Sequence, residues 1–300
     1  MGIELAGALI LPIFLYPINN ILVPTDFSPE ARHAFEVALH LAKHTKGRIT
    51  LLHVLDLTEA GGFSSSGSTI SSTNGSIDQI FAIKLMESTK RRLHDLMREA
   101  ATWAADVPVQ DAVENDRIGE GILAAIKHHD INLVVMGTQG HGATEHFFVG
   151  SNTERTIRLS PCPVLTVKHA QQDFKVRNIV FPSDFTEEAA LATDRLHQVL
   201  ATFPDATLHL LHVASDRDEH GMRQQMQAFA ERAQLLHVQT GVVTAKSTVA
   251  GIEEFAQQVN ADLVIIPTHA RSGLSSFFRT SIAETVATHA FPPVLTYHFR

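Results

Sequence analysis

Short apolar runs alternate with amphipathic segments along most of the chain. The runs Asn20–Val23, Arg48–Val54 and Leu133–Met136 are rich in Val, Ile and Leu, which favours buried parallel strands. The segment Pro29–Thr45 instead carries apolar residues at helical period and follows Ser28, a suitable N-cap residue. The pattern therefore predicts a strand, a helix and a second strand at the start of the repeating part of the chain.

The same alternation continues toward the middle of the chain. It predicts a long helix from about Asp78 to Ala104, a strand Pro108–Val113, a helix Gly119–His129 and a strand Val164–Val167. Strands that alternate with helices are typical of parallel sheets joined by right-handed crossovers. We therefore predict an α/β fold of the open, doubly wound, Rossmann-like type, with ligands beyond the C-terminal ends of the strands.

Spaced glycines follow the strand Leu133–Met136. The pattern G-x2-G-x9-G-S is formed by Gly137, Gly140, Gly150 and Ser151. Glycine can adopt φ > 0 and lets a backbone approach a ligand closely, and a helix that begins near Ser151 would offer free N–H groups to an anion. The pattern predicts a phosphate-binding loop, in which His141 could also reach a phosphate. Taken singly, each residue is better explained by a turn or a helix N-cap than by a ligand.

Other segments are expected to end at the same edge of the sheet. Pro24-Thr25-Asp26 follow the first strand, Val54 ends the second, and Gly137 begins the loop after the fourth. One ligand can contact all of them, because the C-terminal ends of parallel strands share an edge. The residues thus predict a nucleotide, with phosphates at the glycines and a base near Val54.

The chain contains this pattern twice. The matching segments, in the same order, are Asn20–Ser28 with Asn178–Thr186, Leu51–Val54 with Leu210–Val213, and Pro163–Thr166 with Pro293–Thr296. Kept order and residue types indicate a tandem duplication, with roughly thirty extra residues in the first copy. Among these, Gly61–Ser76 is too polar and glycine-rich to form a core. We predict a mobile loop at about 58–77, for which a lid over the nucleotide site is the alternative.

The second copy keeps the strands and loses the glycines. Pro267, Ala270 and Thr280 stand where the first copy has its three motif glycines. Proline removes a donor, and the added Cβ atoms crowd the space for a phosphate. We predict that this half binds no nucleotide, although Asp184 and Val213 are kept and another anion remains an alternative.

The glycine pattern, the segment Asn20–Ser28 and the dipeptide His53-Val54 resemble the universal stress protein family. The resemblance covers the chain from about Asn19 onward. It implies ATP as the ligand, with Mg²⁺ or Mn²⁺, and places Asp26 near the ribose or the metal ion. The predicted nucleotide site consists of Pro24, Thr25, Asp26, Val54, Met136, Gly137, Gly140, His141, Gly150, Ser151 and Asn152.

The duplication divides the chain into four parts. We predict an apolar extension over 1–18, a nucleotide-binding domain over 19–168, a linker over 169–175 and a second domain over 176–300. The apolar stretch Leu5–Tyr16 is shorter than the roughly 20 residues that span a bilayer, and it lacks the positive start of a signal peptide. We therefore expect no membrane attachment.

Charge and composition narrow the function further. A net charge of −8 and a pI near 6.1 argue against a nucleic-acid surface, which is usually basic. A single cysteine, Cys162, rules out an intrachain disulfide and fits the cytoplasm. The histidines His33, His40 and His44 share one face of the first helix, which we interpret as a solvated face in preference to a metal site.

No catalytic arrangement accompanies the binding residues. No Walker-type lysine follows the glycines, and no nucleophile is paired with a general base. We therefore expect an ATP-binding regulatory or stress-response module with little turnover. A slow ATPase and a nucleotide-independent scaffold are the alternatives.

The last strand of each copy is apolar yet should lie at a sheet edge. We expect Val164–Val167 and Val294–Tyr297 to pair antiparallel, because unpaired strand edges seek partners. The resemblance implies the same, since single-domain members of the family are expected to dimerise through this strand. The two α/β domains should thus form an internal pseudo-dimer, and a further homodimer is compatible with the sequence.

Overall fold

The structure is a computed structural model that describes residues 18–56, 74–138, 151–171, 173–214, 219–269, 280–289 and 292–299. The N-terminal extension, apart from Ile18, lies outside the described residues. So does most of the loop predicted at 58–77. The end of that predicted loop is described, and it is helical from Asn74 onward.

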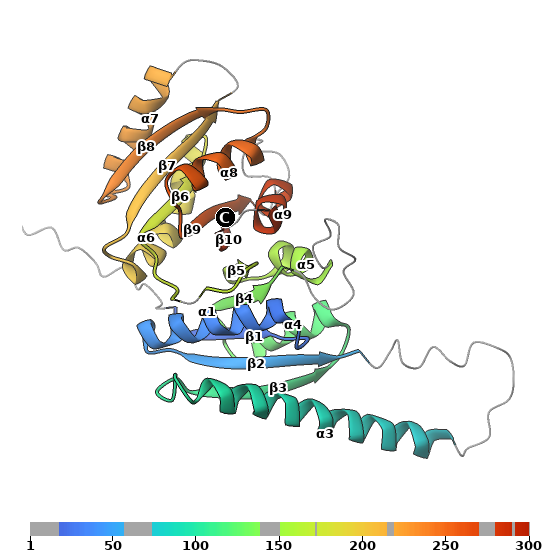
Figure 1. The fold of residues 1–300 in the computed structure, drawn as a ribbon. Coiled ribbons are helices and arrows are strands. Elements are labelled where there is room, and N and C mark those ends of the chain that lie inside the picture. The colour runs from blue at the N-terminus through green and yellow to red at the C-terminus, as the bar shows by residue number, and fades with distance from the viewer. Residues whose placement is uncertain are drawn as a thin grey trace, which may run out of the picture.

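Both copies contribute to one ten-stranded sheet, with the order β3-β2-β1-β4-β5-β10-β9-β6-β7-β8 (Figure 1). The strands are β1 (Asn20–Pro24), β2 (Arg48–Leu55), β3 (Val109–Asn115), β4 (Leu133–Gly137), β5 (Val164–Val167), β6 (Asn178–Pro182), β7 (Thr207–Ala214), β8 (Val238–Thr244), β9 (Leu263–His269) and β10 (Val294–Phe299). Neighbouring strands within each copy are parallel. The predicted fold, two tandem doubly wound α/β domains, is confirmed.

The two copies join through β5 and β10, which pair antiparallel. Leu165 lies opposite Leu295, its equivalent in the other copy, so a pseudo-twofold axis passes between them. The threonine hydroxyls beside them follow the same symmetry. Thr166 Oγ1 donates to the carbonyl of Val294 at 3.2 Å, and Thr296 Oγ1 donates to that of Val164 at 3.3 Å. The expected internal pseudo-dimer is therefore present.

Helices cover both faces of the sheet. They are α1 (Pro29–Thr45), α3 (Asn74–Ala100), α4 (Ile118–His128), α5 (Ser151–Leu159), the 3-10 helix η2 (Glu187–Ala192), α6 (Thr193–Thr202), α7 (Glu219–Arg232), α8 (Thr248–Gln258) and α9 (Thr280–His289). One apolar core lies between the sheet and α1, α3, α6 and α7, and a second lies between the opposite face and α4, α5, α8 and α9. This three-layer arrangement leaves the ends of the strands as the natural place for a ligand.

Helix α1 has the predicted bounds because local signals mark both of its ends. The Ser28 hydroxyl accepts a hydrogen bond from the backbone N–H of Ala31 at 3.2 Å, and Pro29 occupies the first turn. At the other end Lys46 adopts a left-handed conformation with φ of 54°. The apolar stripe of the helix is buried against the sheet.

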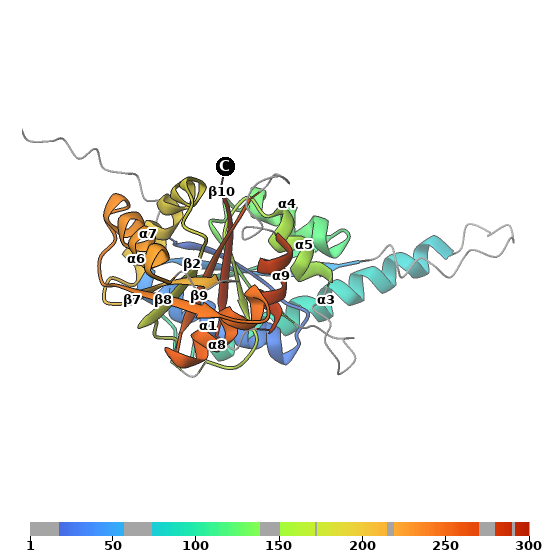
Figure 2. The same cartoon turned by 90° about the horizontal axis from the view of Figure 1, so that it is seen from above.

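Helix α3 was predicted from about Asp78 to Ala104. In the structure it begins at Asn74 and ends at Ala100. Its start includes the polar residues that composition alone assigned to the loop. After Ala100 the chain turns, and the N–H of Ala104 bonds back to the Ala100 carbonyl at 2.9 Å. The helix projects well beyond the rest of the molecule (Figure 2).

The sequence suggested that the histidine-bearing face of α1 is solvated. The structure shows that part of this face packs against other segments. The His44 ring stacks on Phe203 with 6.1 Å between ring centroids, and its Nε2 lies 2.8 Å from the carbonyl of Thr202. His40 lies 5.2 Å from the Trp103 ring. Two of the three histidines thus pack against other segments, and the contact of His44 crosses to the second domain.

The β5–β10 pairing predicts how the domains separate. Leu165→Pro removes a backbone donor from a central strand of the sheet. We expect amide exchange of Val294–Phe299 to accelerate in this variant before the strands β1 and β6 lose protection, because the pairing opens before either domain unfolds. In the wild-type protein, rapid exchange throughout β5 and β10 would show that the two edges are open in solution.

Candidate functional site

The predicted residues end neighbouring strands at one edge of the sheet. Strand β1, which ends at Pro24, lies between β2 and β4. The chain runs from β1 to β2 and β3 on one side, whereas β4 and β5 lie on the other. This reversal is the topological switch point at which open α/β sheets bind ligands. The structure thus brings the segments around Thr25, Val54 and Gly137 to the same edge.

The loop after β1 is fixed by its own hydrogen bonds. The N–H of Thr25 donates to the Leu52 carbonyl at 2.8 Å, and the Thr25 hydroxyl accepts from the N–H of Phe27 at 3.0 Å. Asp26 Oδ1 accepts from the N–H of Ser28 at 3.0 Å. Phe27 is held at φ of 66°, an uncommon conformation for a bulky residue. The Asp26 carboxylate therefore has a defined position at the start of α1.

A stack of three side chains, which sequence reasoning missed, supports this loop. His53 Nδ1 lies 2.7 Å from the Thr25 carbonyl, so Nδ1 carries the proton and donates it. The His53 ring packs 4.8 Å from the ring of Phe27, and the Arg92 guanidinium lies 3.9 Å above that ring. Burial lowers the pKa of His53 below its ordinary value. Arg92 comes from α3, and no local sequence signal links it to this loop.

The second domain repeats the loop geometry. His212 Nδ1 lies 3.1 Å from the Ser183 carbonyl, and Phe185 has φ of 53°. The Ser183 hydroxyl accepts from the N–H of Phe185 at 3.0 Å, and Asp184 Oδ1 accepts from that of Thr186 at 3.3 Å. Because this half lacks the motif glycines, the loop geometry belongs to the fold and does not by itself indicate a ligand.

Gly137 has a structural explanation. It is the last residue of β4, and its backbone does not adopt the positive φ expected of the motif. A Cβ atom there would lie 2.8 Å from the carbonyl carbon of Glu30 in the first turn of α1. Glycine is therefore required at this position by the close approach of α1 to β4. Any role toward a ligand would be additional.

The remaining predicted residues are placed unevenly. Gly140, His141 and Gly150 lie outside the described residues. Met136 is buried in the core on the α4 and α5 side of the sheet. Ser151 and Asn152 begin α5, as the motif predicted for a helix start.

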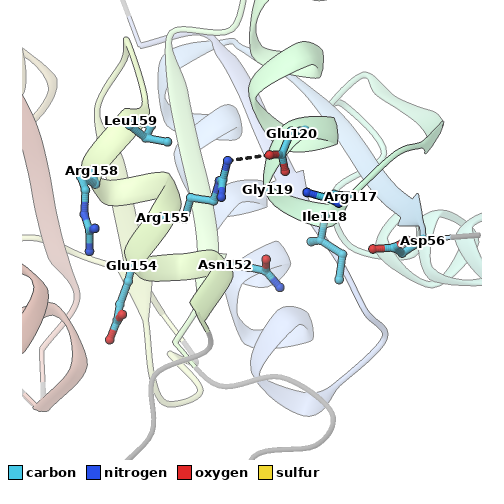
Figure 3. A pocket seen from close by; sticks show the side chains of 10 residues that line it. All are labelled: Asp56, Arg117, Ile118, Gly119, Glu120, Asn152, Glu154, Arg155, Arg158 and Leu159. Atoms are coloured by element: carbon cyan, nitrogen blue, oxygen red, sulfur yellow. Dashed lines mark hydrogen bonds and ion pairs between the residues drawn. The ribbon is translucent and has the colours of Figure 1, made fainter. Parts of the chain in front are cut away.

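A pocket of about 820 Å³ lies between the first turns of α4 and α5 and the end of β2 (Figure 3). It is lined by Asp56, Arg117, Ile118, Gly119, Glu120, Asn152, Glu154, Arg155, Arg158 and Leu159. This volume falls within the usual range for small-molecule sites. Of the described residues predicted to bind the nucleotide, Asn152 lines this pocket. The pocket also takes in the start of α4, which sequence reasoning did not include.

The start of α4 is shaped by two glycines. The Arg155 side chain lies across Gly119 and forms an ion pair with Glu120 at 2.6 Å, which links α5 to α4. A Cβ atom at Gly121 would lie 2.8 Å from Val54 Cγ1, and Gly251 meets Val213 in the same way in the second domain, at 2.7 Å. Glycines inside a predicted helix indicate close packing, a signal that could have drawn attention to α4.

Helix α5 also contacts the second domain. Arg158 donates from Nε and Nη2 to Glu284 Oε1 of α9, at 3.1 and 3.0 Å. One helix therefore carries Asn152 at the pocket, Arg155 against α4 and Arg158 against the other half of the molecule. No helix in the described part of the chain is long and apolar enough to cross a membrane.

The chain matches the model of the universal stress protein family twice, over residues 17–168 and 175–298. The chain therefore belongs to the universal stress protein family. A putative universal stress protein of Staphylococcus aureus strain USA300 is 28% identical over 176 residues, which cover 57% of this chain and 92% of that protein.

A solved structure of this family has the same architecture. A universal stress protein of Archaeoglobus fulgidus matches with a TM-score of 0.65 at 20% identity, over 95% of this chain and 98% of that one. This likeness establishes a shared fold. Another universal stress protein, solved in complex with cAMP, aligns at 20% identity over 42% of this chain and 99% of that one, with a TM-score of 0.35.

The contact between Gly121 and Val54 can be tested as a pair. Gly121→Ala should destabilise the protein by about 1–3 kcal/mol, because the new methyl group overpacks against Val54. Combining it with Val54→Ala should make the double variant less destabilised than the sum of the single variants in urea unfolding. Additive effects would mean that the two residues do not meet. Gly251→Ala with Val213→Ala provides the matched pair in the second domain.

Three histidines that are partly or fully buried predict a pH dependence of stability. Burial lowers the pKa of His53, His40 and His209 in the folded state. Below about pH 6.5 the unfolded chain therefore binds more protons than the folded one, and stability falls as the pH decreases. Urea unfolding should show a lower midpoint at pH 5.5 than at pH 7.5, with a shallower dependence in His53→Gln. A midpoint that rises toward pH 5.5 would contradict this assignment.

Proposed function

We propose that the first domain binds ATP with a divalent cation at the switch-point edge, and that the chain acts as a regulatory or stress-response module with little turnover. The observation that carries the proposal is the pocket of about 820 Å³ at the first turns of α4 and α5. It adjoins the strand ends that hold the predicted residues. Pocket volume, helix N-termini and fold position all suit a phosphate-bearing ligand.

The residues divide into three groups by chemistry. The start of α5, at Ser151 and Asn152, would provide backbone N–H groups to the phosphates, and the glycine pattern of the sequence would extend this site. The end of β2, near Val54 and Asp56, supports a base or ribose. Asp26 supplies a carboxylate oxygen of the kind that Mg²⁺ prefers. Bound ATP would contribute charge and order to this edge, while the protein supplies binding and orientation.

The geometry favours binding over turnover. His53 lies beside the β1 loop, where it is partly buried and uses Nδ1 to hold the Thr25 carbonyl. Its ring is therefore fixed by a structural hydrogen bond, and burial, by lowering its pKa, makes it a weaker base than a free imidazole. The ion pair of Arg158 with Glu284 provides a physical connection from α5 to the second domain. A shift of α5 on nucleotide binding to the first domain would thus be transmitted to α9 of the second domain.

The second domain supports the alternative function of a nucleotide-independent scaffold. It repeats the loop around Asp184 and the packing of Val213 on Gly251, although its motif glycines are replaced. These features therefore persist without a phosphate loop. In the proposed function, this half serves as a binding surface and structural partner for the nucleotide-binding half. A slow ATPase remains the alternative for the first domain.

Calorimetric titration with Mg-ATP should give about one site per chain. This stoichiometry follows from the intact glycine pattern of the first domain and the replaced pattern of the second. Mass analysis of nucleotide released from the purified protein identifies the base, and ADP accumulation separates binding from hydrolysis. Two sites per chain would contradict the assignment of the second domain. Absence of binding would favour the scaffold.

Matched variants locate the site. Gly140→Val and Gly150→Val place branched side chains in the predicted phosphate space and should abolish ATP binding while the protein stays folded, at a cost in stability of about 1 kcal/mol or more if the glycine has φ > 0. Thr280→Val and Ala270→Val occupy the equivalent positions of the second domain and should leave ATP affinity unchanged. Unchanged affinity in both glycine variants would contradict the phosphate-loop assignment.

A further inference from the structure

Thr138, directly after β4, has a buried hydroxyl without a hydrogen-bond partner among the described residues. Its side chain is 1% exposed, and Oγ1 is enclosed. The backbone is satisfied, because the N–H of Thr138 donates to the Val167 carbonyl at 3.3 Å. A buried hydroxyl that lacks a partner lowers stability, so such a group in a native protein requires an explanation.

The second domain shows how the fold satisfies the equivalent hydroxyl. Thr268, which is fully buried, has Oγ1 at 3.2 Å from the Tyr297 carbonyl and at 2.7 Å from His298 Nδ1. Lys168 stands at the position of His298 in the first domain, and lysine offers no acceptor. The difference therefore arises in the half of the chain that keeps the motif glycines.

Thr138 lies on the side of the sheet that α5 covers. Side chains alternate along a strand, and Met136 packs in the core that lies on the α5 side of the sheet. Thr138 follows on the same side. Thr153, in the first turn of α5, donates its hydroxyl to the carbonyl of Gly137 at 3.1 Å. Thr138 thus directly follows a residue in contact with the first turn of α5, whose N–H groups would attract an anion.

We propose that the Thr138 hydroxyl binds the ligand, by donating a hydrogen bond to a phosphate oxygen held at the N-terminus of α5. The inference rests on the proposed nucleotide-binding function and adds a residue to it. A phosphate oxygen is a strong acceptor for a hydroxyl donor. Bound phosphate would satisfy a group that the fold of this domain leaves without a partner, whereas the second domain uses His298 for the same purpose.

Three variants separate ligand binding from folding. Thr138→Val keeps the shape of the side chain and removes the hydroxyl, Thr138→Ser retains the hydroxyl, and Thr268→Val is the matched control. Each is measured by calorimetry with Mg-ATP and with pyrophosphate, and by urea unfolding without ligand. Pyrophosphate requires only the anion site, so it is a probe that does not depend on the base.

We expect Thr138→Val to bind both probes roughly tenfold to a hundredfold more weakly, with a ligand-free urea midpoint equal to or above that of the wild type. Thr138→Ser should bind close to the wild type. Thr268→Val should bind normally and unfold at lower urea. The proposal is overturned if Thr138→Val keeps wild-type affinity, or if its ligand-free midpoint falls as that of Thr268→Val does.

The same data distinguish this inference from the proposed function. If the wild type binds pyrophosphate but not ATP, the nucleotide assignment fails, and the pyrophosphate affinity of Thr138→Val then decides the inference. If the wild type binds ATP and Thr138→Val is unaffected, the nucleotide function stands and the role of Thr138 is wrong. A wild type that binds neither probe overturns both.

Discussion

The antiparallel pairing of β5 with β10 is the constraint on which the rest of the molecule depends. Each domain alone would expose an apolar strand with unpaired N–H and C=O groups. Joined, the strands place Leu165 opposite Leu295 at the centre of one sheet. The hydroxyls of Thr166 and Thr296 reinforce the pairing from both sides. The helices α5 and α9 are brought together over the same junction, where Arg158 meets Glu284.

The duplication separates residues that the fold requires from residues that a ligand would require. The loop with Asp26 recurs at Asp184, and the contact of Gly121 with Val54 recurs in the second domain. Gly137 is explained by the approach of α1 to β4. None of these features needs a nucleotide. The proposed nucleotide function therefore rests on the pocket, on the start of α5 and on differences between the halves, such as the Thr268 hydroxyl having partners that the Thr138 hydroxyl lacks.

Much of the fold was predictable because its signals are local. Apolar runs identified the strands, and Ser28 with Pro29 set the start of α1. The repeat identified the strands that pair at the centre. The bounds of α3 were predicted less well, because its first turns begin in a polar stretch whose composition resembles a loop. Helix-compatible residues near Ala104 gave no indication that the chain turns after Ala100.

The site was only partly predictable, because its parts come together through tertiary packing. Strand ends could be assigned to one edge from topology alone. The stack of Arg92 on Phe27 and His53 could not be predicted in this way, since α3 is separated from β2 by residues with no periodic pattern. The pocket wall formed by α4 was signalled weakly, by glycines within a helix. His44 was predicted to be solvated, whereas it contacts the second domain. Helical periodicity identifies which residues share a face of a helix, but not what packs against that face.

The direction of the central pairing has a consequence for how the molecule meets other molecules. Strands of one half run antiparallel to those of the other, so their carboxyl ends emerge at opposite edges of the shared sheet. The two edges are alike in fold, and they differ in chemistry because the two halves have diverged in sequence. One rim carries the start of α5 and its pocket, and the opposite rim carries the corresponding surface of the second half, with Pro267 in place of Gly137. A partner that approaches one rim therefore meets a chemistry that it would not meet at the other.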